Sequence, residues 1–167
     1  MKENNYLKIK DYLKSLVENS NFLNDFVGFF GRELGNRITS VKGLKSPALI
    51  LYNYEFGLEG PNENTIAVRK IGFWISYGDI KPDELEKQYI AIDNAEKLAL
   101  KVLARIRMDS YIQDHFMYNS FLKDSVEITP AELDYNNFGV SVSFNIKNKQ
   151  LLAVNKDDWK DVKSVCP

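Results

Sequence analysis

The chain has 167 residues, of which 44% are hydrophobic and 27% are charged, a balance typical of a globular protein with a buried core and not of a disordered one. The 22 basic and 23 acidic residues leave a formal net charge of −1, so no overall positive field attracts a phosphate backbone, and we expect no nucleic-acid partner. The single cysteine, Cys166, excludes an internal disulfide and a thiolate metal site.

The sequence has no stretch near the roughly 20 consecutive apolar residues that a membrane-spanning helix requires. Its first residues are polar and charged, unlike a secretion signal, so we expect a protein that is neither secreted nor bound to a membrane. We predict a single domain over 1–167, made of an N-terminal helical segment (1–40), an α+β core (47–147) and a C-terminal tail (148–167).

From the N-terminus, apolar residues recur every three or four positions over 6–17, which predicts an amphipathic helix that ends near Asn19. The next segment, 22–38, combines phenylalanines with glycines, so neither a helical nor a strand period dominates, and we expect a short helix followed by irregular chain. Residues 41–47 are expected to form a loop, because Gly43 permits unusual backbone angles and Pro47 favours an extended residue before it.

Two β-rich runs, 48–56 and 65–77, are separated by a segment, 57–64, that contains Gly-Pro-Asn and is typical of turns, so they predict an antiparallel hairpin. Successive side chains on a strand point to opposite faces. In the first run we expect one face to contain Ala48, Ile50, Tyr52, Tyr54 and Phe56, opposite Leu49 and Leu51. In the second run the more apolar face contains Ala67, Ile71, Phe73, Ile75 and Tyr77.

The longest helix is predicted over 82–108. Pro82 suits a first helical turn, and Asp83 with Glu86 has the spacing of a capping box. The apolar stripe of this helix covers about six turns and contains two alanines that permit close packing against a sheet. The stripe consists of Leu85, Tyr89, Ile92, Ala95, Ala99, Val102, Leu103 and Ile106.

The clearest strand signal comes late in the chain. Over 138–147, apolar residues alternate with small or polar ones, which predicts one dry face and one wet face. Before it we expect an irregular aromatic segment at 111–122, a short strand at 126–128 and a turn at 135–137. Together the elements predict an α+β fold, with a small, mainly antiparallel sheet packed on one long helix and an N-terminal helix nearby.

No set of residues has the spacing of a familiar catalytic, metal or nucleotide site. His115 is the only histidine and the sequence brings no polar group to it, so we interpret it as a surface or locally hydrogen-bonded residue. The acidic residues of 79–86 fit helix capping and lack the spacing of a calcium loop. The glycines of 28–35 lack the Lys-Ser/Thr ending of a phosphate loop. We therefore expect no enzyme, no cofactor and no metal.

Two features make candidates for a protein interface. Lys97, Lys101 and Arg105 form a row at four-residue spacing on the exposed side of the long helix, where they could meet an acidic partner, although a solvated helix face is the commoner explanation. Trp74 lies on the less apolar face of its strand and is a residue type enriched at binding hot spots. Cover by a helix or by the C-terminal tail is the alternative for Trp74.

The order of N-terminal helix, strand-turn-strand over 48–77, helix carrying 92–98 and late strand over 138–146 resembles the tail terminator and tail completion proteins of long-tailed bacteriophages, and the related minor tail proteins of phage-like elements. The resemblance covers about residues 40–150 and is one of architecture. It implies a structural subunit without catalysis, which forms rings, commonly hexameric, that cap the tail tube and join it to the neck.

The resemblance also implies partners and a location. The partners are further copies of the chain and the tail tube protein, with no small molecule or membrane, and segments 57–64 and 111–122 are candidates for ring or tube contacts. The location is the cytoplasm of a bacterial host, and then the virion tail. The chain departs from the family in its longer C-terminal tail and in segment 22–38, which leaves the particular tail component open.

The alternative comes from a different class: a small monomeric adaptor or immunity-type protein that binds one partner protein through an aromatic surface. An enzyme with an unrecognised site is a third interpretation. Stoichiometry separates the first two, because a ring or filament supports the tail subunit and a concentration-independent monomer supports the adaptor.

Overall fold

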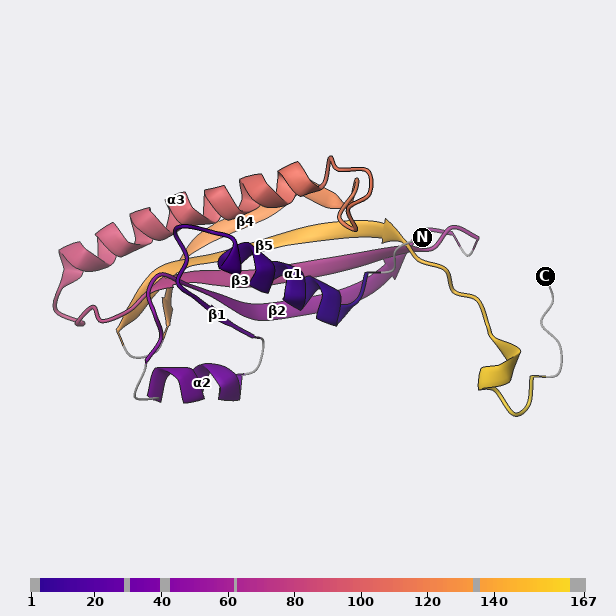
Figure 1. Ribbon diagram of the computed structural model, residues 1–167, viewed down its shortest axis with the longest axis horizontal. Helices are drawn as coiled ribbons and strands as arrows, with labels where there is room; N and C mark the ends of the chain where they lie inside the picture. Colours follow the sequence, from indigo (N-terminus) through magenta and orange to yellow (C-terminus); the bar gives the residue numbers. More distant parts are fainter. Residues whose placement is uncertain (1–3, 29–30, 40–42, 62, 134–135, 163–167) are drawn as a thin grey trace.

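A five-stranded sheet with helices on both faces forms the body of the protein (Figure 1). The computed structural model describes residues 4–28, 31–39, 43–61, 63–133 and 136–162. Parts of the predicted loop at 41–47, of the turns at 57–64 and 135–137 and of the C-terminal tail, Cys166 included, lie outside the described residues. The elements are α1 (Tyr6–Glu18), β1 (Asp25–Val27), α2 (Gly31–Thr39), β2 (Ala48–Glu59), β3 (Ile66–Tyr77), α3 (Leu85–Asp109), β4 (Phe121–Leu133), β5 (Asn137–Lys149) and a 3-10 helix (Lys156–Asp158).

The strand order is β1-β2-β3-β5-β4, with β1 parallel to β2 and every other pair antiparallel. The predicted hairpin is confirmed as β2 and β3, and the alternating strand is confirmed as β5. The fold class is therefore α+β, with a mainly antiparallel sheet packed on a long helix, as the sequence predicts.

One face of the sheet packs against α1 and α3 and contains the main core. Val140, Val142 and Phe144 of β5 are at most 2% exposed, and Ala95 and Ala99 of α3 are fully buried against the sheet. Helix α1 begins where the Asn5 side chain accepts a hydrogen bond from the backbone N–H of Lys8 at 2.9 Å, and it ends before Asn19, as predicted.

Segment 22–38 differs from the prediction, because a strand comes first and a helix follows. β1 is only three residues long, too short to show a period, and it exists because it pairs in parallel with the start of β2. Helix α2 then lies on the second face of the sheet, where Leu34 and Leu44 pack against a small cluster. That cluster consists of Val27, Ala48, Ile50 and Leu133, with Trp74 at its margin.

A bulge corrects the predicted faces of β2. The β2–β3 register shifts between Leu51 and Asn53, so the side-chain alternation changes phase at Tyr52. Tyr54 therefore joins Leu49 and Leu51 on the helix-covered face, whereas Tyr52 lies on the second face. The prediction of one continuous face from Ala48 to Phe56 is wrong for this reason.

The last antiparallel strand before β5 is much longer than predicted. The segment 126–128 is the middle of the 13-residue strand β4, which pairs with β5 on both sides of an irregularity between Leu122 and Glu127. That irregularity interrupts the side-chain alternation along β4, so the strand has no continuous period in the sequence. Pro130 is tolerated because β4 is an edge strand.

Helix α3 begins later than predicted, at Leu85, and its N-cap Glu84 makes no side-chain capping bond, so the capping box of Asp83 and Glu86 does not form. The buried stripe begins near Ala91, and both Leu85 and Tyr89 are exposed because the helix extends beyond the sheet at this end (Figure 1). Within the described residues, no helix is long and apolar enough to cross a membrane.

Candidate functional site

The Trp74 side chain is more buried than its place on the less apolar face of β3 predicts. Its indole stacks on the Tyr52 ring, with centroids 4.6 Å apart, and the Tyr52 hydroxyl lies 2.8 Å from Ser141 Oγ. Tyr52 can lie across the sheet because Gly72 has no side chain; a Cβ there would be 2.7 Å from Tyr52 Cζ. Trp74 is half-buried at the margin of the second-face cluster, and its role in an interface stays a prediction.

The basic row on α3 is exposed, but each of its members interacts with its own chain. Lys97 forms an ion pair with Asp93, and Lys101 Nζ lies 5.2 Å from the Phe22 ring centroid. Arg105 Nε contacts the Asp109 carboxylate at 3.0 Å. A partner surface would compete with these contacts, so the row is a weaker interface candidate than its spacing indicates.

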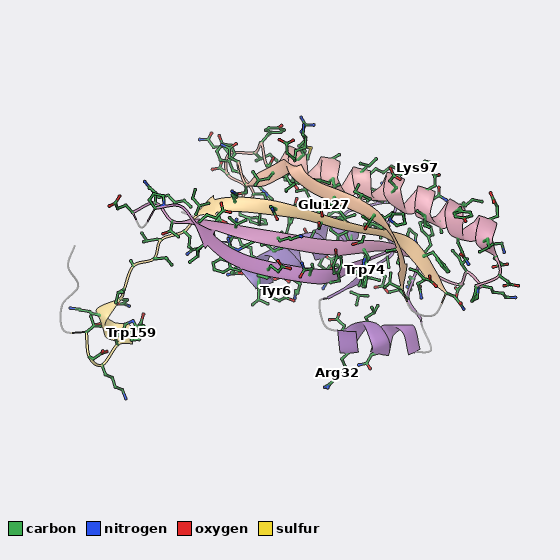
Figure 2. The ribbon with its side chains drawn as sticks, turned by 180° about the vertical axis from the view of Figure 1, so that it is seen from behind. Tyr6, Arg32, Trp74, Lys97, Glu127 and Trp159 are labelled. Atoms are coloured by element: carbon green, nitrogen blue, oxygen red, sulfur yellow. The ribbon has the colours of Figure 1, made fainter. Side chains whose placement is uncertain are left out.

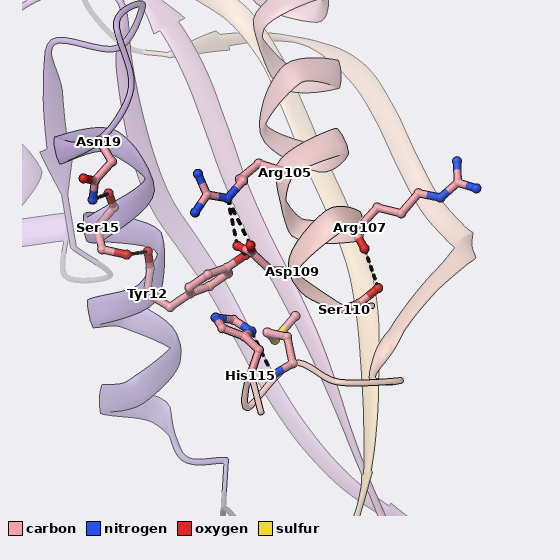
Figure 3. Close-up of polar contacts among 9 residues, drawn as sticks. Tyr12, Ser15, Asn19, Arg105, Arg107, Asp109, Ser110 and His115 are labelled. Atoms are coloured by element: carbon pink, nitrogen blue, oxygen red, sulfur yellow. Dashed lines mark hydrogen bonds and ion pairs between the residues drawn. The ribbon is translucent and has the colours of Figure 1, made fainter. Parts of the chain in front are cut away.

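Asp109 is a buried carboxylate that joins α1 to the last turn of α3 (Figure 3). Tyr12 donates its hydroxyl proton to Asp109 Oδ2 at 2.8 Å, and Arg105 Nε donates to both carboxylate oxygens, at 3.0 and 3.1 Å. Burial, the hydrogen bond to Asp109 and the charge of Asp109 together raise the pKa of Tyr12 well above its usual range. The contacts are those of a structural link between two helices.

His115 lies beside this link, in the turn that precedes β4. Its Nδ1 accepts a hydrogen bond from the backbone N–H of Met117 at 3.2 Å, and its ring meets the Tyr12 ring edge to face at a centroid distance of 5.4 Å. The imidazole is thus locally hydrogen-bonded, one of the two environments expected for it. In the part of the chain that the structure describes, no group of three His, Cys, Asp or Glu residues could hold a metal ion.

His115 also lines an open cavity of about 810 Å³ at the end of the sheet where β5 finishes. The opposite wall consists of the ends of β3 and β5, including Ile66, Asn148 and Lys149. The lining contributes an imidazole, the carboxylate of Asp114, amides and lysines. The expectation that the chain has no catalytic site stays a prediction.

Arg69 is a functional candidate that the sequence analysis missed. It is 3% exposed, and its guanidinium donates to Tyr54 Oη at 3.0 Å, Asn148 Oδ1 at 2.6 Å and the backbone carbonyl of Asn4. The same group stacks on the Phe56 ring at 4.8 Å. Arg69 therefore ties the start of α1, β2, β3 and β5 together near the cavity. Its one sequence signal is a charge in phase with Ala67 and Ile71.

Residues 150–162, named here the C-terminal arm, extend away from the body (Figures 1 and 2). The backbone N–H of Gln150 still donates to Thr65 O at 2.9 Å, whereas the hydrogen bonds beyond it, among the described residues, are local to the arm. The large apolar side chains of the arm are between 51% and 69% exposed. They are Leu151, Leu152, Val154 and Trp159.

A second exposed apolar group lies on β2, close to where the arm begins. Phe56 and Leu58 are 51% and 45% exposed, although they occupy the end of a long strand. The sequence pattern predicts Phe56 on one face with Ala48 and Ile50, and predicts that Leu58 lies in a turn. Exposed large apolar side chains thus lie on the arm, on this end of β2 and, at Ile66, on the neighbouring start of β3.

The comparisons with known proteins add no relative. No protein-family model matches the chain, and a search of curated proteins finds no significant match.

Proposed function

We propose that the chain is a structural assembly protein of a phage or phage-like tail, a ring subunit that caps the tail tube or joins it to the neck. The observation that supports this most strongly is the C-terminal arm, which leaves a well-packed body and carries four large exposed apolar side chains. Monomeric proteins rarely keep such a group in water, so a protein surface is the natural partner for it.

The architecture supports the same class of protein. The N-terminal helix, the β2–β3 hairpin, the long helix and the β4–β5 pair occur in the order on which the resemblance to tail terminator and tail completion proteins depends. The proposal gives the chain no catalytic step, cofactor or metal. It names further copies of the chain and the tail tube protein as partners, in the host cytoplasm and then in the virion.

The experiment is a tube-end binding assay. Tail tubes assembled from the tube protein of the element that encodes this chain are mixed with gold-labelled chain and viewed by negative-stain electron microscopy. The expected result is label at one end of each tube, together with an arrest of tube elongation. Tubes that elongate equally with and without the chain, and that carry no label at their ends, would contradict the proposal.

The adaptor interpretation predicts a different outcome. It requires a monomer at every concentration and a 1:1 complex with a soluble partner, without any binding to tubes. Light scattering after size-exclusion chromatography measures both states directly. Tube-end binding separates the two classes, because the adaptor interpretation excludes it.

A further inference from the structure

The exposed arm raises the question of which surface receives it. Residues 53–59 of β2, named here the open edge, pair with β3 on one side only. β1 covers the other side of β2 no further than Ile50, and no other described strand pairs there. An unpaired strand edge presents backbone N–H and C=O groups that another extended segment can use.

The two outermost strands of the sheet are less suited to pairing, and β1 is only three residues long. β4 carries Pro130, which cannot donate a ladder hydrogen bond, and its register with β5 is broken between Leu122 and Glu127. The open edge of β2 contains no proline and follows its only bulge, at Tyr52. It is therefore the edge at which a further strand would be added.

The arm and the open edge each carry a pair of exposed apolar side chains at two-residue spacing. Phe56 and Leu58 are two residues apart and lie on one face of β2, and Leu152 and Val154 are two residues apart on the part of the arm that has no regular secondary structure. Neighbouring strands bring side chains on the same face into contact, so each apolar pair can cover the other. The Arg69 guanidinium stacks on one side of the Phe56 ring. This contact orders the Phe56 side chain before a partner binds.

We infer that the arm of one copy adds as a strand to the open edge of a second copy, in a head-to-tail contact. This rests on the proposed function and names its subunit contact. Pairing within one chain is disfavoured by the register: Lys149 lies across Ile66 from Glu59, so the arm starts about 10 Å from β2 and must cross roughly 15 Å to lie beside it. That crossing uses about four or five residues, which are those that carry Leu151, Leu152 and Val154.

The test uses two double variants of the full chain. The arm variant carries Leu152→Asp and Val154→Asp, and the edge variant carries Phe56→Asp and Leu58→Asp. A control variant carries Leu7→Asp and Leu85→Asp, which are 62% and 59% exposed and lie on helices. Circular dichroism establishes that each variant is folded, and light scattering gives its mass. We expect the wild type and the control to assemble, and the arm and edge variants to run at the monomer mass of 19.2 kDa.

Mixing the arm variant with the edge variant is the decisive measurement. Each variant keeps the half-site that the other lacks, so a head-to-tail contact restores one interface, and the mixture forms a dimer that cannot grow further. A mixture that remains monomeric, or an arm variant that assembles like the wild type, would overturn the inference and leave the tube-end assay to decide the proposed function. A wild type that is monomeric at all concentrations would also overturn it.

Discussion

At the scale of single residues, the buried charge of Asp109 depends on its hydrogen-bond donors. Its carboxylate is 2% exposed and accepts hydrogen bonds from Tyr12 and Arg105. Tyr12→Phe removes one donor without changing the size of the ring, and hydrogen bonds to charged groups contribute about 1.5–3 kcal/mol. We expect the free energy of unfolding, measured by urea denaturation, to fall by that amount. Tyr89→Phe is the matched control on an exposed ring and should change it by less than about 0.5 kcal/mol. Equal losses would mean that the buried link adds no stability.

The same hydroxyl gives the protein an expected sensitivity to alkali. The pKa of Tyr12 is raised in the folded state, so its stabilising contribution is complete below its ordinary value near 10 and is lost as pH rises further, when the unfolded chain ionises first. Between about pH 9 and 11 the free energy of unfolding should therefore decrease more steeply for the wild type than for Tyr12→Phe. Parallel decreases in the two proteins would contradict this account of the Tyr12 environment.

At the scale of elements, glycines in the strands are not equivalent. A Cβ on Gly139 of β5 would collide with the backbone carbonyl oxygen of Ile75 in β3, whereas a Cβ on Gly57 of β2 meets no atom within 4 Å. Gly139→Ala should lower the free energy of unfolding by about 3 kcal/mol or more, and failure to fold is the limiting form of that result. Gly57→Ala should change it by less than about 1 kcal/mol. Thermal unfolding of both variants measures the contrast, and similar melting temperatures would refute it.

The elements that the sequence predicts are those whose pattern repeats long enough to stand out. β5 alternates over most of its 13 residues, and α3 keeps an apolar stripe from Ala91 to Ile106, so both are confirmed. β1 has three residues and owes its existence to pairing with β2, which lies about 20 residues further along the chain. The bulges in β2 and β4 change the side-chain phase, and no local residue marks where that happens. The predicted start of α3 is about three residues too early. Pro82 and Asp83 are residue types that favour the first helical turn, but the N-cap is Glu84 and the helix begins at Leu85.

The candidate interface was harder to predict than the fold. Residue type alone makes Trp74 and the basic row interface candidates. In the structure Trp74 stacks on Tyr52, Lys97 pairs with Asp93, and Lys101 contacts the Phe22 ring. The structure adds Arg69, whose contacts come from Asn4, Tyr54 and Asn148 on separate elements, a convergence that spacing along one strand does not reveal. The apolar residues of the arm were visible in the sequence, but only the fold shows that they leave the body.

At the scale of the whole molecule, the two ends of the sheet differ in how they are closed. Helix α2 and the cluster around Ile50 cover the second face at one end (Figure 1). At the other end the open edge, the cavity beside His115 and the arm come together, with Arg69 buried beneath Phe56. Exposed large apolar side chains outside the helices are therefore concentrated at one end, which is the arrangement that a directional, head-to-tail assembly requires.

This asymmetry predicts how the arm responds to protease. Lys156 and Lys160 lie on the exposed arm, and their peptide bonds should be cut quickly by trypsin in dilute protein. If the arm binds a second copy, the rate of these cuts, followed by mass spectrometry, should fall as the protein concentration rises, because the second copy limits the access of the protease to the arm. The arm variant with Leu152→Asp and Val154→Asp should be cut at the same fast rate at every concentration. A wild type cut at a rate independent of concentration would place the arm outside the subunit contact, whatever the mass of the assembly.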